Sequence, residues 1–430
     1  MSEWRHTLSI VIFAAATLVG SLLPQHAQAK VLAQWVELGP DGSSSVRAIT
    51  DEACPFVTFD GNAVAMGVRS EPAQKFDGVK PALFPVRGCE AAVPAGSITA
   101  ILDGKTLPLA KPNPQRIVIF GDTGCRLKAG DPTQACNDAK EWPFPKVATM
   151  AAAARPDLMI HVGDYEYRED ACPAGNAGCA GSPSGYGWDA WNADFFEAAS
   201  PLFAAAPWIM VRGNHEDCSR AGEGWFRFLD PSPMQPACRD LTGDYVVRLG
   251  DFSVLVVDSA KVKDSAGADS EQVPILRRQL VEVLAKVPDY AWLVTHKPVN
   301  AMLAKPGDPH DNIVSNKVLQ AALGADIPAS VRMEVAGHIH FFQAVDFGDA
   351  RPPQLVVGTG GDNLEGMPTA SVTGADINGL KALSAVTYSG FAYMVWDRLG
   401  NNSWNGTLFD VDGKPINHCR LADRALSCGS

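Results

Sequence analysis

From Gln115 onward, short apolar runs alternate with amphipathic segments, and this alternation constrains the fold more than any other feature of the chain. Short apolar runs predict buried strands, whereas apolar residues spaced three and four apart predict helices. We expect strands over residues 116–120, 158–162, 208–211, 253–257, 292–294, 333–336, 354–357, 385–396 and 406–411, and helices over 145–154, 188–199 and 274–287. Such alternation is typical of an α/β protein whose helices cover a sheet.

Five of the apolar runs lead directly into short motifs that carry metal-binding side chains. The motifs are GDTG from Gly121, GDYEY from Gly163, GNHE from Gly213, VTHKP from Val294 and GHIH from Gly337. Loops at the carboxyl ends of strands form the crevice of an α/β sheet, so we expect these side chains to meet there. The donor residues are Asp122, Asp164, Tyr167, Asn214, His296, His338 and His340.

Each motif alone has a structural explanation. GDTG is a common turn sequence, Asn214 could cap a helix, and histidines two residues apart share one face of a strand whether or not they bind metal. Tyr165 lies close to Tyr167 in the sequence, and aromatic residues near a site are often packing residues. The occurrence of all five motifs in this order favours one shared site over five unrelated turns.

The donor set predicts a site for two metal ions. Imidazole suits zinc and other transition metals, so its mixture with carboxylate, amide and phenolate oxygens favours two d-block ions over calcium or magnesium. Two ions held about 3.5 to 4 Å apart need a bridging anion. We assign the bridge to Asp164, because Tyr167 follows it by three residues and could close over the same ion.

The motif series resembles the calcineurin-like metallophosphoesterases, and within them the purple acid phosphatases, over about residues 116–342. The first motif of the superfamily is usually Asp-x-His, but Gly124 stands where that histidine would be. Purple acid phosphatases share this loss and have a tyrosine three residues after the second aspartate, matched here by Tyr167. The resemblance implies an α/β fold of the metallophosphoesterase type, a β-sandwich flanked by helices (αββα). A small β-rich module precedes this fold in the present chain.

Carried over to this chain, the resemblance implies ligands for two ions, an Fe(III) and a divalent Zn, Mn or Fe. Two aspartates and one phenolate contribute three negative charges against five positive ones, which leaves positive charge to hold hydroxide and a phosphate ester. The first ion would be held by Asp122, Asp164, Tyr167 and His340, and the second by Asp164, Asn214, His296 and His338.

The implied activity is that of a metal-dependent phosphoric ester hydrolase, similar to an acid phosphatase and acting on phosphate monoesters. A metal-bound hydroxide would attack phosphorus in line, while His215, which is not needed as a ligand, would assist the leaving group. A phosphodiesterase or nucleotidase with the same metal site is one alternative, because pocket walls set the leaving group. A second alternative is a secreted protein that binds metal and phosphate without catalysing hydrolysis. Arg126 could meet a phosphate oxygen, although a surface salt bridge would explain it equally well.

Residues 1–29 have the pattern of a secretory signal peptide, with Arg5, an apolar stretch and a small-x-small end at Ala27-Gln28-Ala29. No later stretch is long and apolar enough to span a bilayer, so we expect no stable membrane span after the signal is removed. Ten cysteines fit an oxidising compartment, and a secreted or periplasmic protein is predicted. Pairing neighbours along the chain would join Cys54 to Cys89, Cys125 to Cys136, Cys172 to Cys179, Cys218 to Cys238 and Cys419 to Cys428, although sequence cannot establish connectivity.

Changes in composition along the chain predict the domain boundaries. We expect a small β-rich module over 30–109, a proline-rich linker, a metallophosphoesterase domain over 115–411 and a disulfide-tied tail over 412–430. An apolar content of 46% suits a large core. The net charge of −12 argues against a nucleic-acid surface, so the expected partner is a small-molecule phosphate ester. The sequence does not predict the oligomeric state.

Overall fold

The computed structural model describes residues 1, 30–74, 80, 82–287, 290–305, 308–324, 327–400 and 402–429. The expected signal peptide therefore lies outside the described residues, apart from Met1. Within the described ranges, no helix has the length and apolar character needed to cross a bilayer.

Two large sheets form the body of the protein, as far as the described residues go. One has eleven strands, in the order β28 (Ala425–Gly429), β27 (Pro415–Ala422), β26 (Ser403–Asp410), β25 (Ala392–Gly400), β11 (Arg116–Phe120), β12 (Leu158–His161), β13 (Trp208–Met210), β1 (Val31–Leu38), β2 (Ser44–Thr50), β8 (Arg87–Ala92) and β5 (Gly67–Ser70). The other has seven, in the order β14 (Tyr245–Leu249), β15 (Phe252–Val257), β16 (Ala291–Thr295), β19 (Val331–Ala336), β21 (Gln354–Val357), β20 (Phe342–Asp346) and β24 (Ser384–Tyr388).

The strands that lead into the motifs are the parallel ones at the centre of each sheet. Strands β11, β12 and β13 run parallel in the larger sheet, and β15, β16, β19 and β21 run parallel in the smaller one. Parallel central strands are buried on both faces and therefore have continuous apolar sequences. Their carboxyl ends point the same way within each sheet, which brings the motif loops together.

The two sheets pack face to face as a sandwich. The ring of Trp292 in β16 lies 5.8 Å from that of Trp396 in β25 and 5.0 Å from that of Trp404 in β26, measured between centroids. All three side chains are buried, and they join the sheets through one hydrophobic core. Aromatic pairs at these separations add to the stability that burial of their area provides.

Helices cover the outer face of each sheet. Beside the larger sheet lie α1 (Phe144–Ala153), α2 (Trp188–Trp191) and α3 (Ser200–Phe203), where Phe144 packs 5.8 Å from Phe120 of β11. The smaller sheet is covered by α5 (Gln272–Leu284) and α6 (Lys317–Leu323), whose buried side chains share a core with Leu255 and Leu293. The αββα arrangement predicted from the sequence is confirmed.

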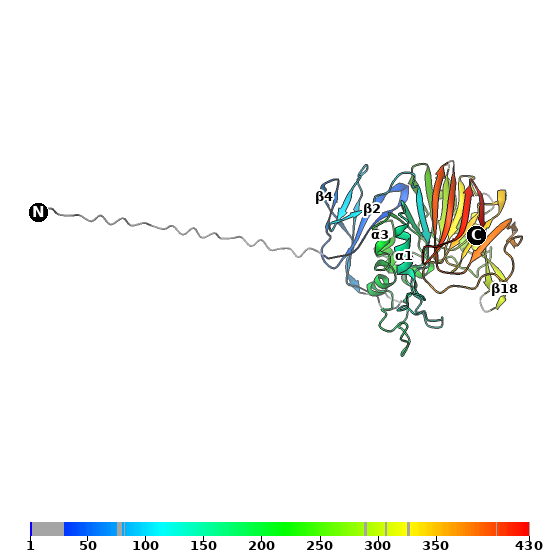
Figure 1. Cartoon of the computed structure of the whole chain (residues 1–430), viewed down its shortest axis with the longest axis horizontal. Coiled ribbons are helices and arrows are strands. Elements are labelled where there is room, and N and C mark those ends of the chain that lie inside the picture. Colours follow the sequence, from blue (N-terminus) through cyan, green and yellow to red (C-terminus); the bar gives the residue numbers. More distant parts are fainter. Residues whose placement is uncertain are drawn as a thin grey trace.

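The N-terminal region is rich in strands, as predicted, and its first strands continue the larger sheet. Strand β1 pairs in parallel with β13, with Glu37 opposite Trp208. A four-stranded sheet lies beside it, in the order β10 (Lys105–Leu107), β9 (Ala100–Leu102), β3 (Phe56–Phe59) and β4 (Asn62–Ala65). Figure 1 shows β2 and β4 at one end of the molecule and the β18 hairpin at the other.

The short elements are hairpins and single turns. The hairpins are β6 (Ala73–Gln74) with β7 (Leu83–Phe84), β17 (Ala301–Lys305) with β18 (Asp308–Ser315), and β22 (Asp376–Ile377) with β23 (Leu380–Lys381). The turns are η1 (Pro40–Gly42), η2 (Asn192–Phe196), η3 (Asn214–Glu216), α4 (Gly222–Gly224), η4 (Trp225–Leu229) and η5 (Gly348–Ala350).

Two expected elements are wrong in their extent. The helix expected over 188–199 is instead α2 followed by the π-helical turn η2, which gives Asp194 a buried position where its carboxylate binds the main-chain N–H groups of Cys125 and Tyr167. The strand expected over 385–396 is two strands, because the chain leaves the smaller sheet after β24 and enters the larger one as β25. Residues 412–430 contain β27 and β28, which extend the larger sheet.

All five cysteine pairs expected from the sequence are present as disulfides. They join Cys54 to Cys89, Cys125 to Cys136, Cys172 to Cys179, Cys218 to Cys238 and Cys419 to Cys428. Three of them close loops that adjoin the first three motifs and so restrict the motion of those loops.

Candidate metal centre

Three strand-end residues have left-handed backbone conformations that bring the motifs together. Asp122 after β11, Asp164 after β12 and His338 after β19 have φ values of 59°, 58° and 69°. Residues other than glycine rarely adopt such angles, and the cost, of order 1–3 kcal/mol each, is typical of functional sites. At each strand end the chain turns sharply, so that the side chain faces the neighbouring motifs.

Tyr167 reaches the centre of the cluster, whereas Tyr165 does not. The Tyr167 hydroxyl lies 2.9 Å from Asp164 Oδ2, 3.3 Å from Asp122 Oδ1 and 3.2 Å from His340 Nε2. The Tyr165 hydroxyl instead donates to the carbonyl oxygen of Val211, at 2.9 Å. Of the two tyrosines in the motif, only Tyr167 directs its hydroxyl to the aspartates.

Gly124 is required by the position of Tyr167. A Cβ atom at residue 124 would lie 2.7 Å from Cδ2 of the Tyr167 ring, closer than side-chain atoms approach. The ring therefore occupies the space that a histidine two residues after Asp122 would need. The position of the Tyr167 ring in the second motif therefore depends on the glycine at residue 124 in the first.

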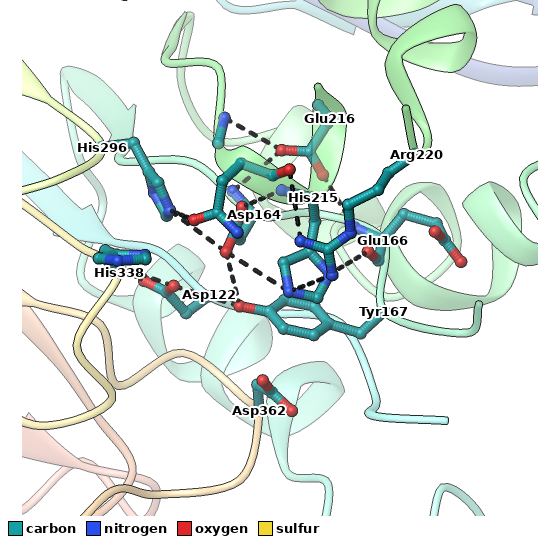
Figure 2. A network of polar contacts seen from close by, with 12 residues as sticks. Asp122, Asp164, Glu166, Tyr167, His215, Glu216, Arg220, His296, His338 and Asp362 are labelled. Carbon is teal, nitrogen blue, oxygen red and sulfur yellow. Dashed lines mark hydrogen bonds and ion pairs between the residues drawn. The ribbon is translucent and has the colours of Figure 1, made fainter. Parts of the chain in front are cut away.

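Asp164, His296 and His338 form the second half of the cluster. One donor atom from each of these residues lies within 4.8 Å of the others. His296 Nε2 lies 3.2 Å from Asp164 Oδ2 and 3.0 Å from Asn214 Oδ1. Figure 2 shows Asp164 between His296 on one side and Tyr167 on the other, with Asp122 and His338 close by. The seven predicted donors thus lie around a single centre, with Asp164 in contact with both halves.

Residues 115–342 match the model of the calcineurin-like phosphoesterases, a span of more than half of the chain. The chain belongs to the calcineurin-like phosphoesterase family. Members of this family are metal-dependent hydrolases that act on phosphoric esters, and the oxygen and imidazole donors of the cluster suit such ions.

Two solved structures have a similar fold. Purple acid phosphatase PPD1 from yellow lupin (Lupinus luteus) seeds has a TM-score of 0.57 and 14% sequence identity, covering 92% of this chain and 73% of its own. PhoD has a TM-score of 0.55 and 11% identity, covering 94% and 93%. At such low identity the likeness concerns the fold alone. No curated protein shows significant sequence similarity to this phosphoesterase.

Neighbouring carboxylates raise the pKa of two histidines of the cluster. Burial disfavours a charged His296, but the Asp164 carboxylate outweighs this effect and raises the pKa of His296 to about 9. Burial also disfavours a charged His340, but Asp362 and Asp122 outweigh this effect and raise the pKa of His340 to about 10. Buried carboxylates that attract protons onto neighbouring imidazoles are suited to bind cations in place of those protons.

His215 lies beside the cluster and has several partners. Its main-chain N–H donates to Asp164 Oδ1 at 2.8 Å, and its ring lies 3.7 Å from the Tyr167 ring. Nδ1 of the imidazole lies 3.2 Å from the carbonyl oxygen of Glu166, and the Arg220 guanidinium contacts both ring nitrogens. Burial, together with Arg220, lowers the pKa of His215 to about 3. The ring is therefore neutral near pH 7.

Several supporting residues were not predicted from the sequence. Glu216, which is buried, accepts hydrogen bonds from four main-chain N–H groups, those of Asp164 (3.2 Å), Tyr165 (2.9 Å), Glu166 (3.2 Å) and Gly213 (3.0 Å). It holds the second motif against the third. Its place within GNHE is a signal that could have identified it.

Asp264 is a second residue that the sequence did not indicate. Its Oδ2 lies 3.4 Å from His338 Nε2 and accepts from Lys297 Nζ at 2.6 Å, while Oδ1 accepts from Asn316 at 2.9 Å. Carboxylates that contact a metal-binding histidine commonly fix the orientation of its ring. The only signal in the sequence is Lys297 in the VTHKP motif, whose partner could not be inferred.

Arg126 makes ion pairs with two carboxylates. It contacts Asp131 Oδ2 through Nη1 at 3.0 Å, and Asp362 through Nε at 3.0 Å and through Nη2. The Asp362 side chain is fully buried, so the pair of Arg126 with Asp362 is not a surface salt bridge.

Proposed function

We propose that this phosphoesterase is an exported phosphatase that hydrolyses phosphate monoesters at a dinuclear metal centre. The observation that carries the proposal is the Tyr167 hydroxyl placed among Asp122, Asp164 and His340, with Gly124 where a ligand histidine would be in the wider superfamily. A phenolate among carboxylates favours Fe(III) at this position, and a divalent Zn, Mn or Fe would occupy the other.

The ligands are proposed to divide into two sets that share Asp164. Bound there, the two ions would supply Lewis acidity, activate a water molecule and offset charge on the phosphoryl oxygens. Asn214 contributes no charge, so the second ion keeps its full attraction for a phosphate oxygen. The first set is Asp122, Asp164, Tyr167 and His340, and the second is Asp164, Asn214, His296 and His338.

His215 is proposed to assist the departing alkoxide. It lies next to Asn214 in the chain and outside both ligand sets, and its contacts with Glu166 and Arg220 fix the ring beside the centre. A neutral imidazole N–H can donate a hydrogen bond to the leaving oxygen as negative charge develops there. Hydrolysis then needs no covalent enzyme intermediate.

Five disulfides support export, because such bonds persist in oxidising compartments. A secreted or periplasmic location is proposed, with residues 1–29 as the signal that is removed. The same metal centre would also serve a phosphodiesterase or nucleotidase, since the walls of the pocket select the leaving group. We propose that the enzyme prefers phosphate monoesters.

The experiment uses mature protein loaded with iron and zinc or manganese. We expect hydrolysis of an aryl phosphomonoester to exceed that of the corresponding diester, and His215→Ala to lower kcat by about 10² to 10⁴-fold, the range for a lost general acid. Inactivity on both esters would show that the metal site serves binding alone. A preference for the diester would replace the monoesterase by the alternative.

The assignment of Tyr167 is tested in the same preparation by colour. Tyrosinate bound to Fe(III) absorbs visible light, so Tyr167→Phe should be colourless. Tyr165→Phe is the matched control, because the Tyr165 hydroxyl donates to Val211 outside the cluster. Colour that persists in Tyr167→Phe, or an active wild-type protein without colour, contradicts the ligand assignment.

A further inference from the structure

Arg126 lies over the ring of Tyr167. Its guanidinium carbon is 5.0 Å from the centroid of that ring, within the range in which a cation is attracted to an aromatic face. The guanidinium is also turned toward Asp362, to which Nε donates at 3.0 Å. One planar group thus contacts both the tyrosine and a buried carboxylate.

Asp362 connects the same guanidinium to two further residues of the centre. Its Oδ2 lies 3.4 Å from His340 Nδ1, the ring nitrogen remote from the Tyr167 hydroxyl. The same nitrogen lies 2.7 Å from the carbonyl oxygen of Asn363, the residue that follows Asp362, so this segment contacts the His340 ring through both residues. Its main-chain N–H donates to the carbonyl oxygen of Asp122 at 2.9 Å. The residues that contact this pair are Tyr167, His340 and Asp122, all in the set proposed for the first ion.

Gln134 links the main-chain segments that carry Arg126 and Asp362. Its side chain accepts from the main-chain N–H of Arg126 at 2.9 Å and donates to the carbonyl oxygen of Gly361 at 2.8 Å. Gln134 is 3% exposed, and the Cys125–Cys136 disulfide closes the loop that carries it. The segments that bear Arg126 and Asp362 are therefore held together independently of their ion pair.

We propose that Arg126 and Asp362 are a positioning pair for the first ion, in which Arg126 holds the phenolate ring of Tyr167 and Asp362 orients His340. This inference rests on the proposed function, because it assumes that Tyr167 binds Fe(III) as tyrosinate. Arg126 is the only described residue whose guanidinium lies over the Tyr167 ring and is also bound to a carboxylate that contacts His340.

The positive charge over the ring has an optical consequence. A guanidinium near the phenolate stabilises the electrons of the ring, so more energy is needed to transfer one of them to Fe(III). Removal of the charge should therefore shift the visible band of the iron-loaded protein to longer wavelength. A purely structural ion pair would not move the band.

The experiment compares Arg126→Gln with the double variant Arg126→Gln/Asp362→Asn, in which a neutral pair can still form a hydrogen bond. The matched control is Arg398→Gln. Arg398 lies 5.6 Å from the Trp404 ring and pairs with Asp251. Its main-chain N–H donates to the carbonyl oxygen of Gln115, just before β11, whereas Asp122 follows the other end of that strand. Visible spectra, iron content and melting temperature are measured for each protein.

We expect the band to shift to longer wavelength in both Arg126 variants and to stay in place in Arg398→Gln. Loss of iron from a variant that keeps its wild-type melting temperature would also support a positioning role. A band at the wild-type wavelength in iron-loaded double variant overturns the pair, even if Arg126→Gln alone fails to fold. If wild-type protein loaded with iron has no such band, the Tyr167 assignment itself fails and the pair fails with it.

Discussion

At the scale of single residues, three of the proposed metal ligands are protonated at neutral pH. Without a cation, His296 and His340 have pKa values of about 9 and about 10, and burial among carboxylates raises the pKa of the Tyr167 phenol well above its usual range. All three groups carry a proton at neutral pH. Metal ligands must be deprotonated, so binding of the ions displaces these protons.

Metal loading is therefore predicted to release about three protons at pH 7.5, one each from His296, His340 and Tyr167. Because the pKa values lie above the working pH, the apparent affinity should rise with pH, by about tenfold per unit for each proton released, until the pH passes them. Calorimetric titration with zinc in buffers of different ionisation enthalpy measures the proton count for the second ion, for which about one proton, that of His296, is expected.

His418→Ala is a control for this measurement, because His418 is an exposed residue of β27. It should leave the proton count unchanged. Binding without proton release, or an affinity that falls as the pH rises from 6 to 8, would contradict the assigned ligands.

The convergence of the seven residues could be predicted because their motifs follow apolar runs that the sequence marks as strands. Their supporting residues could not. Asp362 lies 236 positions from Arg126, and Asp264 lies in a loop without any motif, so their contacts depend on the tertiary fold. The choice of Tyr167 over Tyr165 came from the resemblance, and in the structure both side chains are fully buried but their hydroxyl groups point to different partners.

At the scale of elements, the loops after β12 and β13 act as one unit because Glu216 joins them. Its two carboxylate oxygens share four main-chain N–H donors, with Gly213 and Asp164 on Oε2 and with Tyr165 and Glu166 on Oε1. The close approach of these loops also requires Gly213, where a Cβ atom would lie 2.1 Å from Asp164 Oδ1.

Glu216→Gln is predicted to lower the free energy of unfolding by about 2–3 kcal/mol, because one accepting oxygen becomes an NH₂ group that faces N–H donors. The loss is measured by chemical denaturation of ion-free protein. Glu282→Gln, on the exposed face of α5, is the matched control and should change stability by less than about 0.5 kcal/mol. Equal effects of the two substitutions would show that Glu216 does not brace the loops.

The elements that sequence patterns misjudged are those whose form depends on distant contacts. The π-helical turn at Asn192–Phe196 carries Asp194, whose carboxylate binds the Arg168 side chain and main-chain N–H groups far from it in the sequence. The break between β24 and β25 depends on the partner strands, because β24 pairs with β20 in the smaller sheet whereas β25 pairs with β11 and β26 in the larger one. Apolar periodicity records burial and strand character, but it does not record the partner strand.

At the scale of the whole molecule, the N-terminal strands are attached to the phosphoesterase domain through buried arginines. Arg69 of β5 donates to the main-chain carbonyl oxygens of Phe226 (2.9 Å), Arg227 (3.0 Å), Asp230 (2.7 Å) and Ser232 (2.9 Å). It also pairs with Glu90 at 3.1 Å. The segment it contacts includes η4, which follows the loop of His215 and Arg220, so the N-terminal strands support the wall of the metal centre.

Arg69→Met is predicted to destabilise the protein by about 3–5 kcal/mol, because it removes the side-chain donor of the buried carbonyl oxygens of Phe226, Arg227 and Ser232. Arg47 still contacts Glu90 and the Asp230 carbonyl oxygen in this variant. Arg87→Met on the neighbouring strand is the matched control, since the ion pair of Arg87 with Glu71 is exposed and worth at most about 1 kcal/mol. Denaturation of both variants gives the two energies, and limited proteolysis shows where the chain opens. If the N-terminal strands are a supporting part of the domain, cleavage in Arg69→Met should extend to the 222–232 segment, and phosphoesterase activity should fall with it. Opening confined to residues before 109, with full activity, would instead mean that the N-terminal strands fold beside the metal centre without supporting it.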